Sequence, residues 1–280
     1  MKVQCRWQPD YASASILAAL RLEAAAVGRT GAVCVRRRIA TPKGNYRATI
    51  EAITALVSAI ELQIGEIVPV GIGIPGTISP IRGLVKNANS TWLIGRPLQQ
   101  DLETEFGRPT CLANDANCFA LSEATDGAAV GMQTVFGVIL GTGVGGGIAQ
   151  GGRILLGANA IAGEWGHNPL PWPTPGEIPG PACYCGRSGC IETFLSGPAL
   201  AADHRHGGRS LRAIEIATLT TRGDAECAAS LGRYMDRLAR GLASMINLID
   251  PMRSWWGRSF GHNGAVQASS PAVGAVHLLG

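Results

Sequence analysis

A cluster of glycines between two apolar runs constrains this chain more than any other feature. The segment reads TVFGVILGTGVGGGIAQGGRI over residues 134–154. The apolar runs predict two buried strands, and the glycines predict a tight turn between them. The turn matches G-x-G-x-x-G, but a dinucleotide-binding turn needs a helix after the glycines, and here a second strand follows. We therefore expect a β-hairpin whose turn presents backbone N–H groups to a phosphate, with a plain tight hairpin as the alternative.

Strands and helices alternate along the rest of the chain. Isoleucine, leucine and valine recur at helical spacing over residues 47–64, which predicts an amphipathic helix. The apolar run IVPVGIGIPG at 67–76 predicts a buried strand and a turn, and a further strand is expected at 110–113. Further helices are expected at 97–106, at 116–128 and at 225–250, before Pro251. This alternation indicates the α/β class.

Both ends of the chain are harder to interpret. Residues 12–27 are rich in alanine and are read as a helix, although the first 35 residues as a whole are atypical. Residues 252–280 show no clear period. They place two tryptophans beside polar residues, so no element is assigned there.

Composition excludes several classes of protein. Hydrophobic residues make up 46% of the 280 residues and charged ones 16%, which is enough for a large core and does not fit disorder. The net charge of +4 is too weak for a nucleic-acid-binding footprint. We expect no membrane span and no secretory leader, because there is no run of 18 apolar residues and no leader-like segment at the N-terminus. The expected compartment is the cytoplasm, with neither nucleic acid nor membrane as a partner.

Three cysteines lie within eight residues, at Cys183, Cys185 and Cys190, sixteen positions after His167. In a reducing compartment such a cluster indicates metal binding before a disulfide. Three thiolates and one imidazole form a closed tetrahedral set typical of structural zinc. Spacing does not force the choice of His167, since His204 and His206 are rivals. Free cysteines in a flexible loop are the alternative.

Candidate binding residues follow several of the predicted strands. Asp115 ends a strand and opens a helix, where α/β proteins bind ligands and where a carboxylate can accept a proton; it could also simply cap the helix. Glu164 and Glu192 lie beside the cysteine loop and could grip sugar hydroxyls, or could be ordinary surface glutamates. Gly76 and Asn89 are added as substrate-binding candidates, although each motif alone is more often a turn.

Taken together, six motifs resemble one protein family. GIGIPG, KNANSTW, NDAN, GTGVGGG, AGEWGHNPL and CYCGRSGCIE stand in this order over residues 71–192. They resemble the ROK family of sugar kinases and repressors over roughly residues 36–251. KNANSTW and EWGHNPLPW are similar to its bacterial fructokinase branch, which also phosphorylates mannose.

The resemblance implies a two-lobed, actin-like (ribonuclease H-like) α/β ATPase fold of ROK type. The expected lobes are a small one over 1–116 and a large one over 117–280. It also implies ATP-dependent phosphorylation of a hexose, with fructose to fructose 6-phosphate as the expected reaction and mannose and glucose as alternative substrates. ATP, Mg²⁺ and a structural Zn²⁺ are the implied cofactors, and a homodimer is the implied assembly.

The resemblance further assigns roles to individual residues. Asp115 is the implied base that deprotonates the attacking sugar hydroxyl. The residues implied to face the sugar are Asn114, Glu164, His167 and Glu192. The residues implied to cradle phosphate are Gly141, Thr142, Gly143 and Gly145. The residues implied to hold zinc are His167, Cys183, Cys185 and Cys190.

The chain departs from this family at both ends. The family opens with Asp-x-Gly-Gly-Thr-Lys, and here Tyr11–Leu20 reads YASASILAAL instead. Codons can be written for this stretch that give Arg-Ile-Gly-Ile-Asp-Leu-Gly-Gly-Thr when read two bases further on. Codons for residues 253–261 likewise contain Ile-Val-Val-Gly in one shifted frame and Gly-Gly-Gly-Leu-Ser in another. We hypothesise that both ends are frameshifted. If the frameshifts are real in the gene, we expect weak or no kinase activity for this chain; if they are sequencing errors, the natural protein is an ordinary kinase.

Two other functions compete with a kinase. A ROK transcriptional repressor would carry a helix-turn-helix of roughly 60 to 80 residues before the sugar domain, and only about 35 residues precede the family-like region here. A catalytically impaired protein that binds sugar without turnover is the second alternative.

Overall fold

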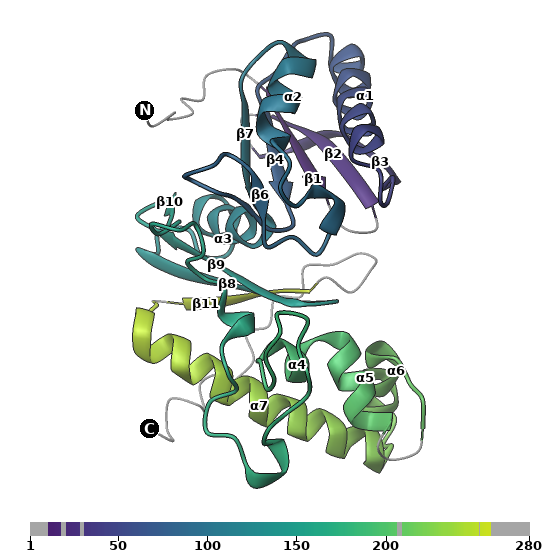
Figure 1. Cartoon of the computed structure of the whole chain (residues 1–280), viewed down its shortest axis with the longest axis vertical. Helices are drawn as coiled ribbons and strands as arrows, with labels where there is room; N and C mark the ends of the chain where they lie inside the picture. The colour runs from purple at the N-terminus through teal and green to yellow at the C-terminus, as the bar shows by residue number, and fades with distance from the viewer. Residues whose placement is uncertain (1–10, 18–20, 29–30, 206–208, 252, 259–280) are drawn as a thin grey trace. The chain divides into compact units, whose positions relative to one another are not determined.

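The computed structural model describes residues 11–17, 21–28, 31–205, 209–251 and 253–258 (Figure 1). The chain divides into two compact units, which we describe separately. The first unit comprises Met1–Cys118 and Leu156–Ile161, and the second comprises Phe119–Leu155 and Ala162–Gly280. Each unit contains one main sheet and several helices, so the α/β class expected from the sequence is confirmed.

A five-stranded sheet forms the centre of the first unit. Its strands, in spatial order, are β3 (Val33–Ala40), β2 (Arg21–Gly28), β1 (Tyr11–Leu17), β4 (Val70–Ile74) and β7 (Thr110–Asn114). β2 runs antiparallel to both of its neighbours, β3 and β1, whereas β1, β4 and β7 run parallel to one another. Parallel strands end at the same edge of a sheet, so the chain leaves β4 and β7 at one common edge.

The helix expected over residues 12–27 is wrong. Residues 12–17 lie in β1 and residues 21–27 in β2, and these two strands pair antiparallel with Ser13 opposite Ala26. Along β2 the buried positions alternate, with Leu22, Ala24 and Ala26 nearly inaccessible to solvent. Alanine favours a helix in isolation, but this period of two lets one face of the strand pack on the core, and tertiary packing overrides the intrinsic preference.

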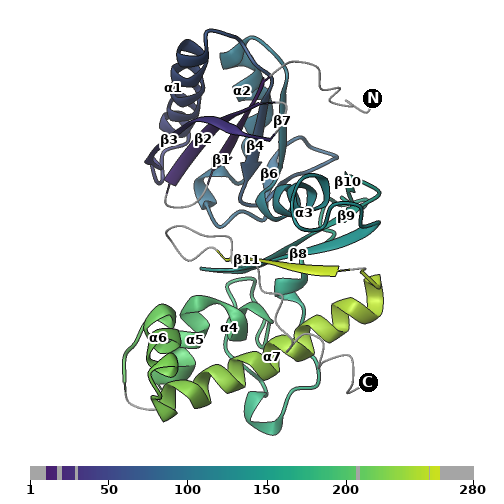
Figure 2. The same ribbon diagram turned by 180° about the vertical axis from the view of Figure 1, so that it is seen from behind.

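Helix α1 (Tyr46–Ile64) confirms the amphipathic helix expected from the sequence. Asn45 caps its start, where the side chain accepts a hydrogen bond from Ala48 N, and Gly65 ends it in the left-handed conformation. Ile50, Ile53, Val57 and Ile60 lie on one face and are 2% exposed or less, and each contributes roughly 1.5–3 kcal/mol by leaving water. Together with α2 (Leu98–Phe106), this helix packs on the sheet (Figure 2).

Short elements connect the larger ones in the first unit. β5 (Thr77–Ile78) and β6 (Val85–Lys86) form a small hairpin, and the 3₁₀ helix η1 (Thr91–Leu93) follows it. Helix α3 (Asp115–Thr125) begins directly after β7, and its first residues belong to the first unit. It ends three residues before the sequence predicted.

The second unit is built on the hairpin expected from the glycine cluster. β8 (Thr134–Leu140) and β9 (Val144–Gln150) pair antiparallel, with Leu140 opposite Val144 beside the turn. The sheet is completed by β10 (Arg153–Ile154) beside β9 and by β11 (Arg253–Arg258), which runs parallel to β8. The two predicted strands and their glycine-rich turn are therefore confirmed.

Helices and an irregular loop make up the rest of this unit. The helices are α4 (Glu192–Leu195), α5 (Gly197–Arg205), α6 (Ala213–Thr221) and α7 (Ala225–Ile249). Residues 172–190 form an irregular loop rich in proline, glycine and cysteine. The 3₁₀ helix η2 (Trp165–His167) precedes it, and the 3₁₀ helix η3 (Pro175–Glu177) lies within it. Across the described ranges, no helix is both long enough and apolar enough to span a bilayer.

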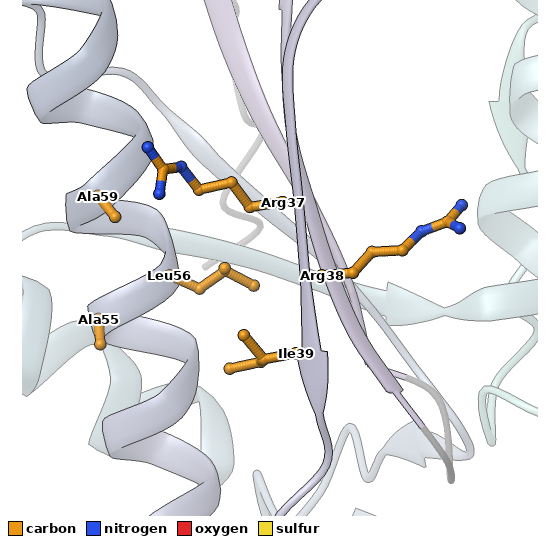
Figure 3. A pocket seen from close by; sticks show the side chains of 6 residues that line it. All are labelled: Arg37, Arg38, Ile39, Ala55, Leu56 and Ala59. Carbon is orange, nitrogen blue, oxygen red and sulfur yellow. The ribbon is translucent and has the colours of Figure 1, made fainter.

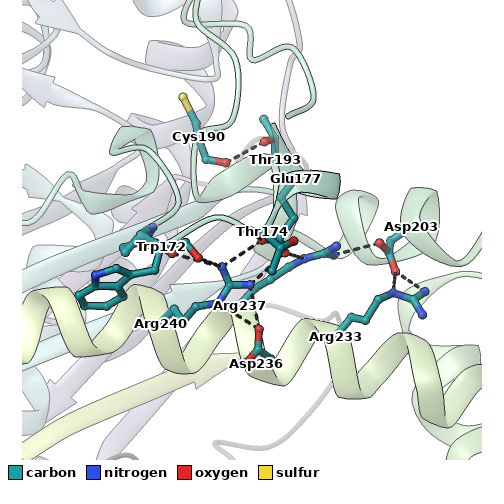
Figure 4. A network of polar contacts seen from close by, with 11 residues as sticks. Trp172, Thr174, Glu177, Cys190, Thr193, Asp203, Arg233, Asp236, Arg237 and Arg240 are labelled. Atoms are coloured by element: carbon teal, nitrogen blue, oxygen red, sulfur yellow. Dashed lines mark hydrogen bonds and ion pairs between the residues drawn. The ribbon is translucent and has the colours of Figure 1, made fainter. Parts of the chain in front are cut away.

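A buried ion-pair network ties the irregular loop to α7 (Figure 4). Glu177, only 7% exposed at its side chain, accepts a 2.8 Å hydrogen bond from Arg237 Nε and bonds of 2.9 and 3.0 Å from the two terminal nitrogens of Arg240. Arg237 also reaches Asp203 on α5 at 2.9 Å. Burial alone would raise the pKa of Glu177, but the bonds from the two arginines and from Thr174 N outweigh burial and lower this pKa to about 2.

This network predicts a destabilised Glu177→Gln variant. The substitution removes the carboxylate that Arg237 and Arg240 share and leaves them only their ion pairs with Asp203 and Asp236, so we expect the free energy of unfolding at pH 7 to fall by about 2 kcal/mol. Because the folded pKa lies below the ordinary value of 4.5, the carboxylate stabilises the fold above pH 4.5, and that stabilisation disappears as the pH approaches 2. Urea unfolding at several pH values measures both effects. An equal difference between variant and wild type at pH 7 and pH 3 would contradict this account.

Candidate active site and metal centre

Asn114 and Asp115 lie where β7 ends and α3 begins. Asn114 Oδ1 accepts hydrogen bonds from Ala116 N at 3.0 Å and from Asn117 N at 3.2 Å, so it caps the helix. Asp115 is the first helical residue, and its Oδ1 accepts a hydrogen bond from the adjacent Ala116 N at 2.9 Å. The capping function that the sequence left open for Asp115 therefore falls mainly to its neighbour.

Burial perturbs the Asp115 carboxyl. Loss of solvent raises its pKa above the ordinary value of 3.8, and hydrogen bonds from the Ala116 and Asp115 backbone N–H groups oppose this only in part. The nearby Cys118 thiol has its pKa raised to about 11 by burial and by the Asp115 charge. A carboxylate with a raised pKa accepts a proton more readily than a fully solvated one, which suits a general base.

Gly76 meets Asn114 at the common edge of β4 and β7. Asn114 Nδ2 donates to Gly76 O at 3.1 Å. Gly76 has a φ of +87°, and a Cβ at this position would lie 2.5 Å from Lys86 O. Only glycine allows the turn after β4 to approach the end of β6 this closely. Asn89 is exposed in the segment after β6.

The predicted phosphate turn, residues 141–144, is compact in the second unit. Gly141 N donates to Gly143 O at 2.9 Å, and Gly141 O accepts from Gly197 N at 2.7 Å. Thr142 is exposed at the tip. Within the described ranges, the N–H groups of Thr142 and Gly143 donate to no protein acceptor, so both are available to an anionic ligand.

Glycines in β9 allow the segment that carries Glu164 and His167 to lie directly on the strand. Trp165 is 1% exposed and donates from its indole nitrogen to Gly145 O at 2.9 Å. A Cβ at Gly146 would lie 2.8 Å from the Trp165 ring, and a Cβ at Gly166 would lie 2.1 Å from Val144 O. Side chains at either position would push the segment away, so the packing itself requires these glycines.

Glu192 lies against the same turn. Its Oε2 accepts a hydrogen bond from Val144 N at 2.8 Å. The Tyr184 residue is 76% exposed, but partial desolvation of its hydroxyl, followed by the negative charges of neighbours that include Glu192 and Glu164, raises the pKa of the phenol. The second unit therefore gathers the predicted sugar-facing carboxylates near Tyr184. No motif in the sequence pointed to this tyrosine, although it stands between the predicted ligands Cys183 and Cys185.

His167, Cys183, Cys185 and Cys190 form a four-ligand cluster. Their ligand atoms all lie within 4.8 Å of one another. Cys183 Sγ is 3.6 Å from His167 Nδ1, and Cys185 Sγ is 3.6 Å from Cys190 Sγ. His167 Nε2 lies 3.1 Å from the Tyr184 hydroxyl, which orients the ring so that Nδ1 faces the thiols.

The spacing of the cluster fits a tetrahedral zinc ion. Zn–S bonds of about 2.3 Å in a tetrahedron place two sulfurs about 3.8 Å apart, close to the observed separation. Three thiolates and one imidazole leave no open position, so the residues could hold a structural Zn²⁺ that orders the loop. Of the two rival histidines, His204 is buried elsewhere and its Nδ1 lies 3.1 Å from Ser230 Oγ; His206 lies outside the described residues.

A shallow pocket of about 360 Å³ opens in the first unit between β3 and α1 (Figure 3). Its lining residues are Arg37, Arg38, Ile39, Ala55, Leu56 and Ala59. Arg37 is bound to Gln63 at 2.8 Å, and Arg38 turns away from α1 to pair with Glu23. None of the residues assigned from the sequence lines this pocket, and we give it no part in the site.

Metal analysis tests the cluster directly. We expect wild type to retain about one zinc per chain after dialysis against a weak chelator, because four ligands converge. Cys185→Ser and Cys190→Ser should lose most of the zinc and lower the melting temperature. Cys34→Ser, at an exposed cysteine on β3, is the matched control and should retain zinc. Undiminished zinc in both cluster variants would refute the assignment.

Comparison with known proteins places the chain in a family. The model of the ROK family matches residues 19–267. An N-acetyl-D-glucosamine kinase of Salmonella arizonae is 40% identical over 77% of this chain and 73% of its own length, and that of Vibrio cholerae is 37% identical over 86% and 82%. These relatives support similarity to sugar kinases but not to the fructokinase branch specifically.

Comparison with solved structures leads to the same family. The ROK hexokinase of Thermus thermophilus matches with a TM-score of 0.79 and 28% identity over 96% of this chain and 88% of that one. A ROK family glucokinase of Streptomyces griseus, solved with glucose and AMPPNP, matches with a TM-score of 0.75 and 28% identity over 89% and 83%. The chain therefore belongs to the ROK family and has its two-lobed, actin-like α/β fold.

Proposed function

We propose that this protein catalyses the transfer of the γ-phosphoryl group of ATP to a hydroxyl group of a hexose. The observation that carries the proposal is the environment of Asp115. This carboxylate lies at the carboxyl end of a parallel strand, is largely removed from solvent, has a raised pKa and is spared helix capping by Asn114. Similarity to N-acetyl-D-glucosamine kinases and to a glucokinase solved with an ATP analogue supports the reaction class.

In this proposal Asp115 accepts the proton of the attacking hydroxyl as the sugar oxygen forms its bond to phosphorus and the bond to ADP breaks. A positioned base contributes about 10²- to 10⁴-fold to such a step. The open N–H groups of Thr142 and Gly143 are the proposed phosphate donors, with Gly141 and Gly145 shaping the turn. Bound Mg²⁺ would supply charge neutralisation across the phosphate oxygens.

The proposed sugar-binding residues include the carboxylates of Glu164 and Glu192 and the imidazole of His167. Three further residues of the first unit complete the set. Carboxylates and imidazole nitrogens accept or donate hydrogen bonds to hydroxyls, and buried polar groups of this kind discriminate among sugars by leaving a wrong isomer unpaired. The residues are Asn114, Glu164, His167, Glu192, Gly76 and Asn89. In this arrangement Zn²⁺ is structural and orders the loop that carries Cys183, Cys185 and Cys190.

Two sugars are candidates, each on its own observation. Fructose is favoured by the motifs KNANSTW and EWGHNPLPW, which resemble the fructokinase branch. N-acetyl-D-glucosamine is favoured by the relatives at 37–40% identity. We propose fructose as the preferred substrate, because these motifs contribute His167 and Asn89 to the proposed sugar-binding set.

A substrate panel tests the reaction and the choice of sugar. ADP release is measured with fructose, mannose, glucose and N-acetyl-D-glucosamine, for this chain and for one in which Arg-Ile-Gly-Ile-Asp-Leu-Gly-Gly-Thr replaces Tyr11–Leu20. We expect weak turnover for the first and clear turnover for the second, with fructose giving the highest kcat/KM. A preference for N-acetyl-D-glucosamine would overturn the choice of sugar, and no product from either chain would overturn the reaction. Sugar binding without product would instead favour the sugar-binding alternative.

The base is tested by Asp115→Asn, with Asp126→Asn on the same chain segment as the matched control. Removing the proton acceptor should lower kcat by about 10²- to 10⁴-fold while zinc content stays unchanged. In wild type, kcat should fall as pH decreases, with a midpoint above 3.8, because burial raises the pKa of the carboxylate that must be ionised. Undiminished turnover by Asp115→Asn would remove the assignment.

A further inference from the structure

We propose that Glu192 is a positioning residue that holds the 141–144 turn in shape, so that order in the cysteine loop is transmitted to the phosphate-binding backbone. The inference deepens the proposed function, since it takes this turn as the phosphate site. Glu192 is already assigned to sugar binding. The proposal adds a second function, positioning of the turn, which the sequence did not suggest. Three observations carry it, all within the second unit.

The first observation is that Glu192 is fixed in place from its N-terminal side. It stands two residues after the cluster ligand Cys190 and opens α4. The residue between them, Ile191, is fully buried, and its N–H donates to Asn168 O at 2.9 Å. The Glu192 backbone is therefore held between the cysteine cluster and the core, and disorder in the cluster would displace it.

The second observation is that the two ends of the turn are held by the same segment. Glu192 Oε2 accepts from Val144 N at 2.8 Å, which holds the end that enters β9. Gly197 N, just beyond α4, donates to Gly141 O at 2.7 Å and holds the end that leaves β8. These bonds leave the Thr142 and Gly143 N–H groups between them directed to no protein acceptor in the described structure.

The third observation is the close fit at Gly143. A Cβ at this position would lie 2.6 Å from Glu192 Oε2. Since that oxygen is the end of a flexible side chain, an alanine would displace the carboxylate and not the backbone. Gly143→Ala and removal of the Glu192 side chain therefore both disrupt the same contact, between the Glu192 carboxylate and the turn. Their effects should not be additive.

The charge of Glu192 argues that its contribution here is geometric. A carboxylate beside a phosphate-binding turn repels the phosphate, so electrostatics alone would disfavour it. What the turn needs is a hydrogen-bond acceptor for Val144 N–H. A glutamine provides that acceptor without the charge, and an alanine does not.

Amide hydrogen exchange of peptides that cover residues 141–144 tests the contact without any activity assay. We expect Glu192→Ala to exchange about 10-fold faster than wild type at Val144, because a charge-assisted hydrogen bond is lost. Glu192→Gln should stay close to wild type. Removal of metal by a chelator should accelerate exchange in the same peptide while peptides of α1 in the first unit remain protected. Glu226→Ala, at an exposed glutamate on α7, is the matched control.

The double-mutant cycle tests the functional consequence. Binding of a non-hydrolysable ATP analogue is measured for wild type, Gly143→Ala, Glu192→Ala and the double variant. We expect each single variant to bind about 10-fold more weakly and the double variant to bind no more weakly than the worse of the two. Additive losses, or equal exchange at Val144 in Glu192→Ala and wild type, would overturn the positioning function. Failure of both the wild type and the chain with the replaced Tyr11–Leu20 segment to bind the analogue would count against the proposed function instead, and exchange at Val144 would still decide whether Glu192 holds the turn.

Discussion

The close approach of backbone to backbone along β9 is the constraint on which the candidate site depends. Gly146 and Gly166 have no room for a Cβ, and the buried indole of Trp165 joins the two segments through its bond to Gly145 O. Glycine costs conformational entropy in a strand, and here that cost is offset by the burial of a large aromatic side chain. As a result, Glu164 and His167 are held at defined positions on either side of Trp165.

A second constraint is electrostatic, and it holds the irregular loop over residues 172–190 in place. A loop rich in proline and glycine cannot bury enough apolar surface to order itself. Glu177 compensates by pairing with Arg237 and Arg240, which lie one turn apart on α7 and so present their guanidinium groups on one face. The loop is thus held by α7 at one end and by the cysteine cluster at the other, and Glu192 follows directly from the ordered end.

Local sequence patterns predicted the structure correctly where interactions between residues close in the chain determine it. The 3.6-residue period found α1, the glycines between apolar runs found the β8–β9 hairpin, and the cysteine spacing found a cluster whose ligand atoms do converge. The same patterns failed over residues 12–27, where alanine suggested a helix. Pairing between β1 and β2, and the burial of alternate residues along β2, depend on a sheet that a local window of sequence does not contain.

The sequence by itself determined the class of fold, the identity of the candidate ligands and the family, because these follow from residue chemistry and spacing. Only the tertiary structure decided how those groups act on one another. It assigned helix capping to Asn114 and so separated Asp115 from that function, placed His204 away from the cysteines, and set the Glu192 carboxylate against Val144 N. Some of these outcomes depend on contacts between residues that belong to different elements. Others depend on which of several neighbouring acceptors receives a hydrogen bond from a given N–H group. Spacing along the chain carries no information about either.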